Sequence, residues 1–220
     1  MKAFLTETAG KSFHEAIVAI ERVSSAEVVV AVRRGARASF APHLSVAVPL
    51  LFAVLLYTLY SETEFPLWQI FAWPLAAALL GFAAVAEVDA IYRAIAPREL
   101  REHHVVEAAR AMFYAKGVHA TTKRTGVLVY IALRERMVEL VGDLAFVAAV
   151  DAATRDTWSA SLVAALPDGA ATGRALAKLA DDFAAKLPHR TGDTNELADD
   201  VVEVMAVARH PRGRRARGVS

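Results

Sequence analysis

Residues 42–61 read PHLSVAVPLLFAVLLYTLYS, and residues 65–86 read FPLWQIFAWPLAAALLGFAAVA. Neither segment, of twenty and twenty-two residues, contains Asp, Glu, Lys or Arg. Each can cross a bilayer as a helix, because a rise of about 1.5 Å per residue carries about 20 residues across a hydrocarbon core about 30 Å thick. Only the turn SETE at 61–64 separates them, so residues 42–88 are predicted to form a transmembrane helical hairpin with spans at 42–61 and 65–88.

Other features of the two segments agree with a membrane location. Aromatic residues that favour the headgroup boundary lie near the proposed ends, and prolines, which membrane helices tolerate, lie inside. The alternative is a helical pair buried in a water-soluble core, which is disfavoured because a chain of 220 residues has no second apolar mass large enough to surround it. The aromatic residues are Tyr57, Tyr60, Trp68 and Trp73, and the prolines are Pro49 and Pro74.

The charges that flank the hairpin set its expected orientation. Arg33, Arg34 and Arg37 precede the first span, whereas the turn between the spans holds two Glu and no Lys or Arg. Arginines follow the second span at positions 93, 98 and 101. Because cytoplasmic flanks carry the excess of Lys and Arg, both termini are expected in the cytoplasm and the turn outside.

The composition narrows the class of protein. Hydrophobic residues make up 55%, mean hydropathy is +0.34 and net charge is +1, as expected for one modest soluble domain attached to a membrane hairpin. The chain has no cysteine, which excludes disulfides, thiolate zinc sites and cysteine nucleophiles. Residues 1–11 lack the apolar core of a cleaved signal peptide, so the hairpin itself is expected to direct insertion.

Hydrophobic spacing outside the hairpin predicts a small sheet flanked by helices. Residues 26–32 and 126–133 read as strands buried on both faces, and the turn RER at 134–136 leads into an antiparallel third strand at 137–141. The second span is expected to continue as a helix through Tyr92. A helix is predicted over 6–23 with Thr6 as cap, with a later start at Ser12 as the alternative, because Ser12 and Glu15 have the spacing of a capping box. Further helices are predicted from Pro97 to about Lys116, over 144–150, over 155–166 with Thr154 as cap, and over 170–187.

The hairpin therefore interrupts the soluble part after its first strand. The soluble domain is expected to be discontinuous and built from residues 1–37 and 97–207. Residues 208–220 form a basic tail with arginines at Arg209, Arg212, Arg214, Arg215 and Arg217.

The order of several motifs resembles the TPM-domain family, named after a thylakoid-lumen protein, a photosystem repair protein and an acetylcholine-receptor accessory protein. The strand that includes Glu27 matches the usual S/T-G-E-I-V-V-V, with Ala26 in place of Gly. The last motif resembles bacterial members with an internal two-helix membrane insert, with Ala198 where Pro is common. The motifs are SAEVVV at 25–30, RTGVLVYI at 124–131, VELVGD at 138–143 and GDTNEL at 192–197.

This resemblance implies a fold and a range of functions. The fold class is α/β, a small mixed-sheet α/β/α sandwich, here with the transmembrane hairpin inserted, in a multi-pass protein of the bacterial inner membrane. Some members have a reported acid phosphatase activity or bind cations, and others act as assembly or repair factors.

Asp143 and Glu27 are the candidate metal ligands. Asp143 follows a strand, where loops present side chains at the edge of a sheet, and hard cations such as calcium and magnesium prefer oxygen ligands. Glu27 begins the first strand and is a candidate for the same pocket. The structural alternatives are that Asp143 caps the next helix and that Glu27 pairs with a basic side chain on a helix.

Other polar residues are weaker candidates for a functional site. Asp193, Asn195 and Glu196 alternate as in cation-binding loops, although the twelve-residue calcium pattern is missing. Glu139 is expected on the exposed face of an edge strand. His103 and His104 are adjacent on a helix and therefore point apart, as on a solvated helix face. His119 lies in a polar connection, with no nucleophile beside it to make it a general base.

Two functions follow as hypotheses. The first is a membrane-anchored cytoplasmic module that binds a membrane-protein partner or a cation, with the tail either bound to anionic lipid or simply solvated. Nucleic acid binding is disfavoured, since no aromatic or fold feature accompanies the basic residues. The alternative is a metal-dependent phosphatase with Asp143 and Glu27 at its site. A channel is disfavoured because residues 42–61 and 65–86 contain no Asp, Glu, Lys or Arg, the ionisable groups that usually mark a transport path.

Overall fold

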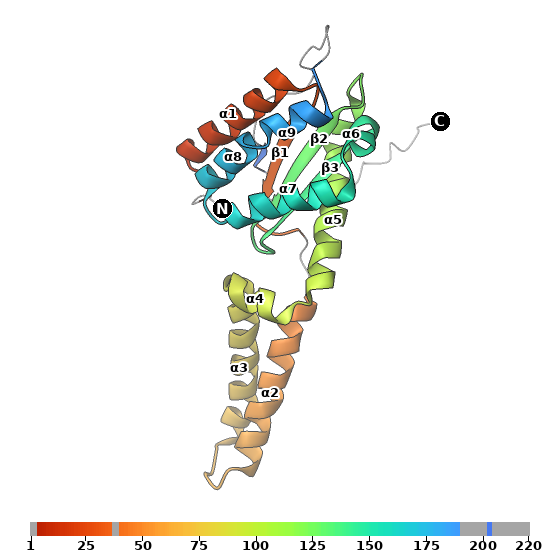
Figure 1. Ribbon diagram of the computed structural model, residues 1–220. Helices are drawn as coiled ribbons and strands as arrows, with labels where there is room; N and C mark the ends of the chain where they lie inside the picture. The colour runs from red at the N-terminus through yellow and green to blue at the C-terminus, as the bar shows by residue number, and fades with distance from the viewer. Residues whose placement is uncertain (1–3, 37–39, 190–201, 204–220) are drawn as a thin grey trace, which may run out of the picture.

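The computed structural model describes residues 4–36, 40–189 and 202–203. Helices α2 (Ala41–Tyr60) and α3 (Leu67–Glu87) form a hairpin that extends away from the sheet and its covering helices (Figure 1). Both have a mean hydropathy of 1.8 over 18 residues, and 17% of each such window is buried. By length and composition, each can cross a membrane.

A mixed sheet lies at the centre of the soluble part. It contains β1 (Glu27–Arg33), β2 (Gly126–Ala132), β3 (Met137–Gly142) and the short β4 (Val202–Glu203), in the order β3-β2-β1-β4. Strand β1 pairs in parallel with β2 and with β4, and β2 pairs antiparallel with β3. The predicted antiparallel β2–β3 pair is therefore confirmed, and β1 has a neighbour on each side, as expected for a strand predicted to be buried on both faces.

Side chains alternate between two apolar clusters on opposite faces of the sheet. Val28, Val30 and Val32 of β1 belong to the cluster that includes residues of α1 (Glu7–Val23). Val29 and Ala31 belong to the second cluster, which includes residues of α5 (Arg98–Ala115). Because successive residues of a strand point to opposite faces, a strand covered on both sides is apolar at nearly every position. The α/β class is confirmed.

The path from the hairpin into α5 differs from the prediction. A continuous helix through Tyr92 is wrong, because Val88 adopts an extended conformation (φ −101°, ψ 97°) between α3 and the short α4 (Asp89–Ile95). Gly117 ends the predicted helix after Pro97, and its φ of +69° is a conformation that glycine adopts without strain. The 3-10 turn η1 (Val118–Ala120) then leads to β2.

The later helices correct two expectations. Thr154 does not cap α7 (Ala152–Ala165), since Asp151 accepts the hydrogen bond from the Thr154 backbone N–H at 2.9 Å. The helix predicted over 170–187 is two helices, α8 (Gly169–Ala177) and α9 (Ala180–Lys186). They separate where the Leu179 N–H donates to Leu176 O, three residues back rather than four. Helix α6 (Leu144–Ala149) follows β3 as predicted.

Candidate functional site

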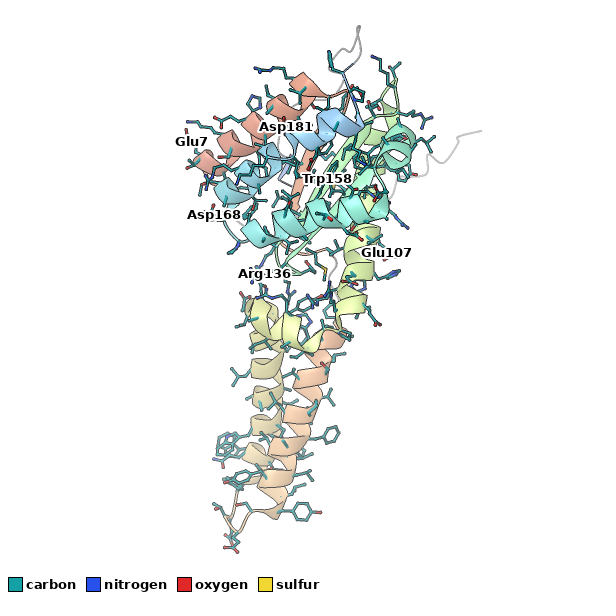
Figure 2. The ribbon with its side chains drawn as sticks, in the orientation of Figure 1. Glu7, Glu107, Arg136, Trp158, Asp168 and Asp181 are labelled. Carbon is teal, nitrogen blue, oxygen red and sulfur yellow. The ribbon has the colours of Figure 1, made fainter. Side chains whose placement is uncertain are left out.

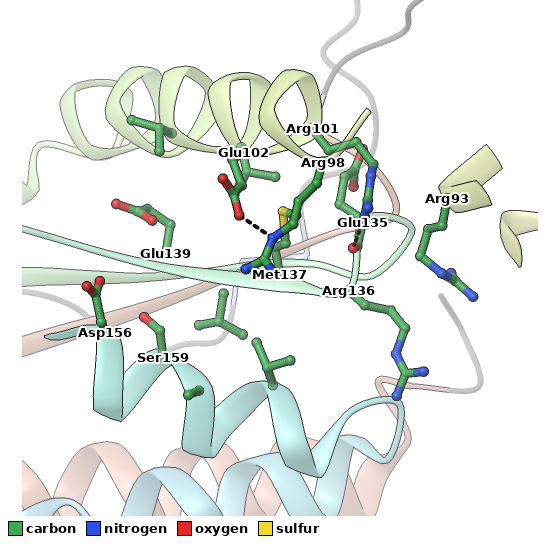
Figure 3. A pocket seen from close by; sticks show the side chains of 15 residues that line it. Arg93, Arg98, Arg101, Glu102, Glu135, Arg136, Met137, Glu139, Asp156 and Ser159 are labelled. Atoms are coloured by element: carbon green, nitrogen blue, oxygen red, sulfur yellow. Dashed lines mark hydrogen bonds and ion pairs between the residues drawn. The ribbon is translucent and has the colours of Figure 1, made fainter. Parts of the chain in front are cut away.

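A groove runs along the outer edge of β3, with α5 on one side and α7 on the other (Figure 3). Among the residues that the structure describes, β3 is the terminal strand and pairs only with β2. A hollow of about 790 Å³ lies over Met137–Glu139, and one of about 290 Å³ continues over Leu140–Gly142. Both are lined by Glu139, Asp156 and Ser159, so we call them together the β3 groove.

Glu139 lies at the centre of the groove. The neighbouring Val138 and Leu140 point into the core cluster on the α7 side, so alternation directs Glu139 toward the α5 side. It is half-buried there rather than on the exposed face that its strand pattern predicted. Burial raises the pKa of Glu139, while the positive charges of Arg110 and Arg155 act in the opposite direction.

Four arginines line the end of the groove nearest the hairpin. Figure 2 shows Arg136 at the side of the soluble part that faces α4. We call this end the arginine mouth, made by Arg93 of α4, Arg98 and Arg101 of α5, and Arg136 of the β2–β3 turn.

Backbone carbonyl groups hold three of these guanidinium groups in place. Arg101 donates through Nε to Ala96 O at 3.2 Å and through Nη1 to Glu135 O at 3.0 Å. Arg93 Nη1 donates to Arg134 O at 3.1 Å. Arg136 has a positive φ of 53°, and its Nη2 donates to Leu166 O at 3.0 Å, at the end of α7. A carbonyl oxygen orients a guanidinium without neutralising its charge.

Arg98 has a different partner. Its Nε lies 2.6 Å from Glu102 Oε1, one turn further along α5, and both side chains are largely exposed. An exposed pair of this kind contributes little stability, because water screens it. Arg98 is therefore the arginine of the mouth that a ligand can most easily engage.

The β2–β3 turn also fastens the sheet to the hairpin through Arg134. Its Nη2 donates to Val85 O of α3 at 2.6 Å, and its Nε lies 3.6 Å from Asp89 Oδ1. The guanidinium also stacks on Tyr92, 3.9 Å from the ring centroid. Together these contacts define what we call the Arg134 clamp.

Glu135 lies beside this clamp and is almost completely buried, at 1% exposure. Its Oε1 accepts a hydrogen bond from the Ala36 N–H at 3.2 Å. Burial raises the pKa of Glu135, although nearby Arg134 and Arg101 oppose the shift. The sequence pattern of residues 134–136 predicts only a turn. The signal that this prediction missed is a run of three charged residues directly between two apolar strands.

The structure brings Glu27 and Asp143 to the same end of the sheet. Glu27 aligns with Gly126 in the parallel β1–β2 pair, and the Asp143 N–H donates to Gly126 O at 2.9 Å. The two residues therefore lie on either side of the start of β2. A Cβ on Gly126 would overlap the Val118 carbonyl oxygen, so η1 packs directly against this position.

Asp143 has the helix-capping role that was the structural alternative. It is the N-cap of α6 and accepts from the Leu144 N–H at 2.8 Å, with Arg124 Nη1 3.6 Å from the same oxygen. Its other oxygen, Oδ2, is buried and has no hydrogen bond from the described residues. Among all residues that the structure describes, no group of three or more His, Asp or Glu side chains is placed to hold a metal ion.

The remaining candidates are placed as follows. His103 is exposed and lies 3.4 Å from Glu107, but the solvated face predicted for both histidines is wrong for His104, which is buried. His119 packs against aromatic rings, with a centroid distance of 5.1 Å to Tyr114. The candidates Asp193, Asn195 and Glu196 and the arginines of the tail, Arg209, Arg212, Arg214, Arg215 and Arg217, lie outside the described residues.

Comparisons with protein-family models and with curated proteins give no match for this chain. Among solved structures, the chain is similar to the NMR structure of the BA42 protein from the psychrophilic bacterium Bizionia argentinensis. The sequences are 15% identical, the alignment covers 93% of this chain and 98% of that one, and the TM-score is 0.55. At this identity the likeness concerns the fold, so it leaves the function of the β3 groove to be argued from its own residues.

Proposed function

We propose that this protein is a membrane-anchored cytoplasmic TPM-like module that binds an extended cytoplasmic segment of a membrane-protein partner along the β3 groove. The observation behind this proposal is that the outer edge of β3 lies between two helices and has no paired strand among the described residues. An unpaired strand edge offers a row of backbone donors and acceptors, which an extended peptide can extend as a further strand. A role in assembly or maintenance of membrane proteins fits such a module.

The membrane anchor in this proposal is supported by the surface of the hairpin. Large apolar side chains are exposed along α2 and α3, among them Phe52, Leu56, Phe71 and Leu79. Exposed apolar area of this extent is stable in lipid and costly in water. The proposed arrangement is a multi-pass protein of the bacterial inner membrane with both termini cytoplasmic, whose soluble domain is an α/β/α sandwich.

The charges in the groove specify the peptide. Glu139 and Asp156 line both hollows, whereas Arg110 and Arg155 line only the hollow over Leu140–Gly142, so a basic side chain that reaches the two carboxylates from the other hollow would be attracted there. Side chains of a strand alternate, so the flanking residues would be strand formers such as Val and Thr. The proposed ligand is an extended, β-branched segment with a central Lys or Arg.

A charge-swap experiment with defined peptides tests this function. The full chain in a nonionic detergent is titrated with fluorescein-labelled TVTKVTVT and with TVTEVTVT, using fluorescence polarisation. We expect the Lys peptide to bind more tightly to the wild type, and Glu139→Lys to reverse the preference, because an opposite-charge pair becomes a like-charge pair.

The control peptide is TVTKVTVT methylated on alternate backbone nitrogens, which removes the donors of one strand edge. It should bind at least tenfold more weakly, since main-chain hydrogen bonds provide the affinity in strand addition (about 1.4 kcal/mol per tenfold). Equal binding of the methylated peptide, or an unchanged preference in Glu139→Lys, would refute the proposed mode.

A second candidate function is divalent cation binding at Asp143 and Glu27, with phosphatase activity as its extension. The buried Oδ2 of Asp143 supports it, because a buried carboxylate oxygen without a hydrogen bond is costly unless it has a partner. Calorimetric titration with calcium and with magnesium should then give binding that Asp143→Asn abolishes, and a bound metal should promote hydrolysis of a phosphomonoester. No heat of binding with either cation would exclude this candidate.

A further inference from the structure

The arginine mouth is a concentration of positive charge that peptide binding at the centre of the groove does not use. Arg93, Arg98, Arg101 and Arg136 come from α4, α5 and the β2–β3 turn, and all line the same hollow. Figure 3 shows Arg93 and Arg136 at one end of it and Glu139 with Asp156 at the other. We infer that the arginine mouth binds an anionic phosphate group, supplied by an anionic phospholipid headgroup or by free phosphate.

The first support is that most of the charge is oriented but not neutralised. Arg93, Arg101 and Arg136 donate to backbone carbonyl oxygens, and each guanidinium has five N–H donors, of which these bonds use one or two. The remaining donors can face an anion. Holding the groups beforehand lowers the entropy lost on binding, which is what distinguishes a built site from scattered surface arginines.

The second support is the chemistry of the guanidinium group. Its planar fork of donors matches the oxygens of a phosphate and can make two parallel charge-assisted hydrogen bonds. Four acidic residues line the same hollow: Glu139 and Asp156 at its other end, and Glu102 and Glu135 beside the arginines. Glu102 pairs with Arg98 at the exposed rim and Glu135 is buried against the Ala36 N–H, so Glu102 is the acid that competes with an anion for Arg98.

The third support is the position of the mouth beside the hairpin. Arg93 follows the end of α3 by six residues, and the adjacent Arg134 bonds to Val85 O within α3 itself. With the hairpin in the membrane, as proposed above, this end of the groove lies at the level of the cytoplasmic headgroups. A basic side chain there gains about 1 kcal/mol from anionic lipid, or about fivefold in affinity.

The test uses the full chain in a nonionic detergent and two probes. Native mass spectrometry measures binding of dioctanoyl phosphatidylglycerol, with dioctanoyl phosphatidylcholine as the lipid of zero net charge. Calorimetry measures binding of inorganic phosphate against chloride at the same ionic strength. The lipid arm depends on the proposed membrane anchor, whereas the phosphate arm does not.

The variants test whether binding depends on an arginine at the mouth or only on the total charge of the chain. Arg98→Gln should weaken binding of phosphatidylglycerol about fivefold. Arg22→Gln is the control, because it makes the same charge change at an exposed position of α1, outside the residues that line the β3 groove, and should leave binding unchanged. Glu102→Gln should strengthen binding about threefold by removing the competing carboxylate. Every variant keeps the basic tail, so any binding by the tail is the same in all of them and cancels when the variants are compared with the wild type.

Each outcome decides the inference. Binding of phosphatidylglycerol alone, sensitive to Arg98, assigns the site to a lipid headgroup, and binding of inorganic phosphate as well extends it to free phosphate. Failure of both probes to bind would overturn the inference, as would equal losses in Arg98→Gln and Arg22→Gln. Peptide binding that persists in Arg98→Gln would separate this site from the proposed partner site.

Discussion

Replacing Arg134 with alanine should release the soluble domain from the hairpin without unfolding either part. The Arg134 clamp joins the β2–β3 turn to α3. The side chain of Arg134 is only 16% exposed. Truncation leaves the cores on both sides intact, because Arg134 belongs to neither apolar cluster of the sheet. We therefore expect the soluble domain to change its position relative to the hairpin while both keep their fold.

The size of the effect follows from three contacts. The hydrogen bond from the charged donor to Val85 O is worth about 1.5–3 kcal/mol. Stacking on Tyr92 adds about 1 kcal/mol, and the ion pair with the partly exposed Asp89 about 0.5 kcal/mol. These contributions are not additive, so about 3 kcal/mol is a reasonable total. This corresponds to a shift of about 150-fold in the equilibrium between attached and detached positions.

Electron paramagnetic resonance can measure the change. The chain has no cysteine, so Glu7→Cys and Glu64→Cys introduce the only two sites for spin labels, on α1 and in the turn of the hairpin. Both positions are exposed. In lipid nanodiscs the wild-type distance distribution should be narrow, and Arg134→Ala should broaden it. Arg22→Ala, which removes an exposed arginine of α1, serves as the control.

A distance distribution in Arg134→Ala as narrow as that of the wild type would contradict the proposed role of the Arg134 clamp. It would then follow that α4 and the other arginine contacts hold the domain without the clamp. A loss of thermal stability in the soluble part equal to that of a core truncation would also contradict it, because it would mean that Arg134 supports the sheet itself.

Three further predictions concern stability, each measured as thermal unfolding of the full chain in detergent. Burial raises the pKa of Glu135, so the folded state keeps the proton to higher pH than the unfolded chain, and wild-type stability should fall as pH rises above the ordinary value of 4.5. Glu135→Gln should make this fall smaller, while the part due to Glu139, whose pKa burial also raises, remains. Equal slopes for both proteins would contradict the assignment to Glu135. Trp158→Ala should destabilise by about 3–5 kcal/mol, because the ring is buried and stacks 4.6 Å from Phe183, and a loss below about 1 kcal/mol would rule out this packing. Gly142→Ala should cost about 1–3 kcal/mol because its Cβ would overlap the Phe146 ring, so a neutral substitution would show that α6 does not pack against β3 in this way.

Local features of the chain were predictable because they depend on neighbours in sequence. The spans at 42–61 and 65–88 overlap α2 and α3. Thr6 caps a helix with its hydroxyl group, and Gly117 ends one because, without a Cβ, it adopts a positive φ at no cost. For Asp143, which lies between a strand and a helix, the sequence left two alternatives, a metal ligand and the cap of the next helix, and the structure shows the cap. Where neighbouring signals compete, as between Asp151 and Thr154, sequence spacing alone chose the wrong residue.

The β3 groove could not be predicted in this way, because its walls come from segments far apart in the chain. Arg98 and Ser159 lie on opposite sides of β3 only because α5 covers one face of the sheet and α7 the other. The Arg134 clamp likewise joins residues 49 positions apart. The amino-acid sequence determined an α/β domain with two long apolar helices, since hydrophobic periodicity is a local property. The tertiary structure alone decided which charged side chains converge, since that depends on how whole elements pack.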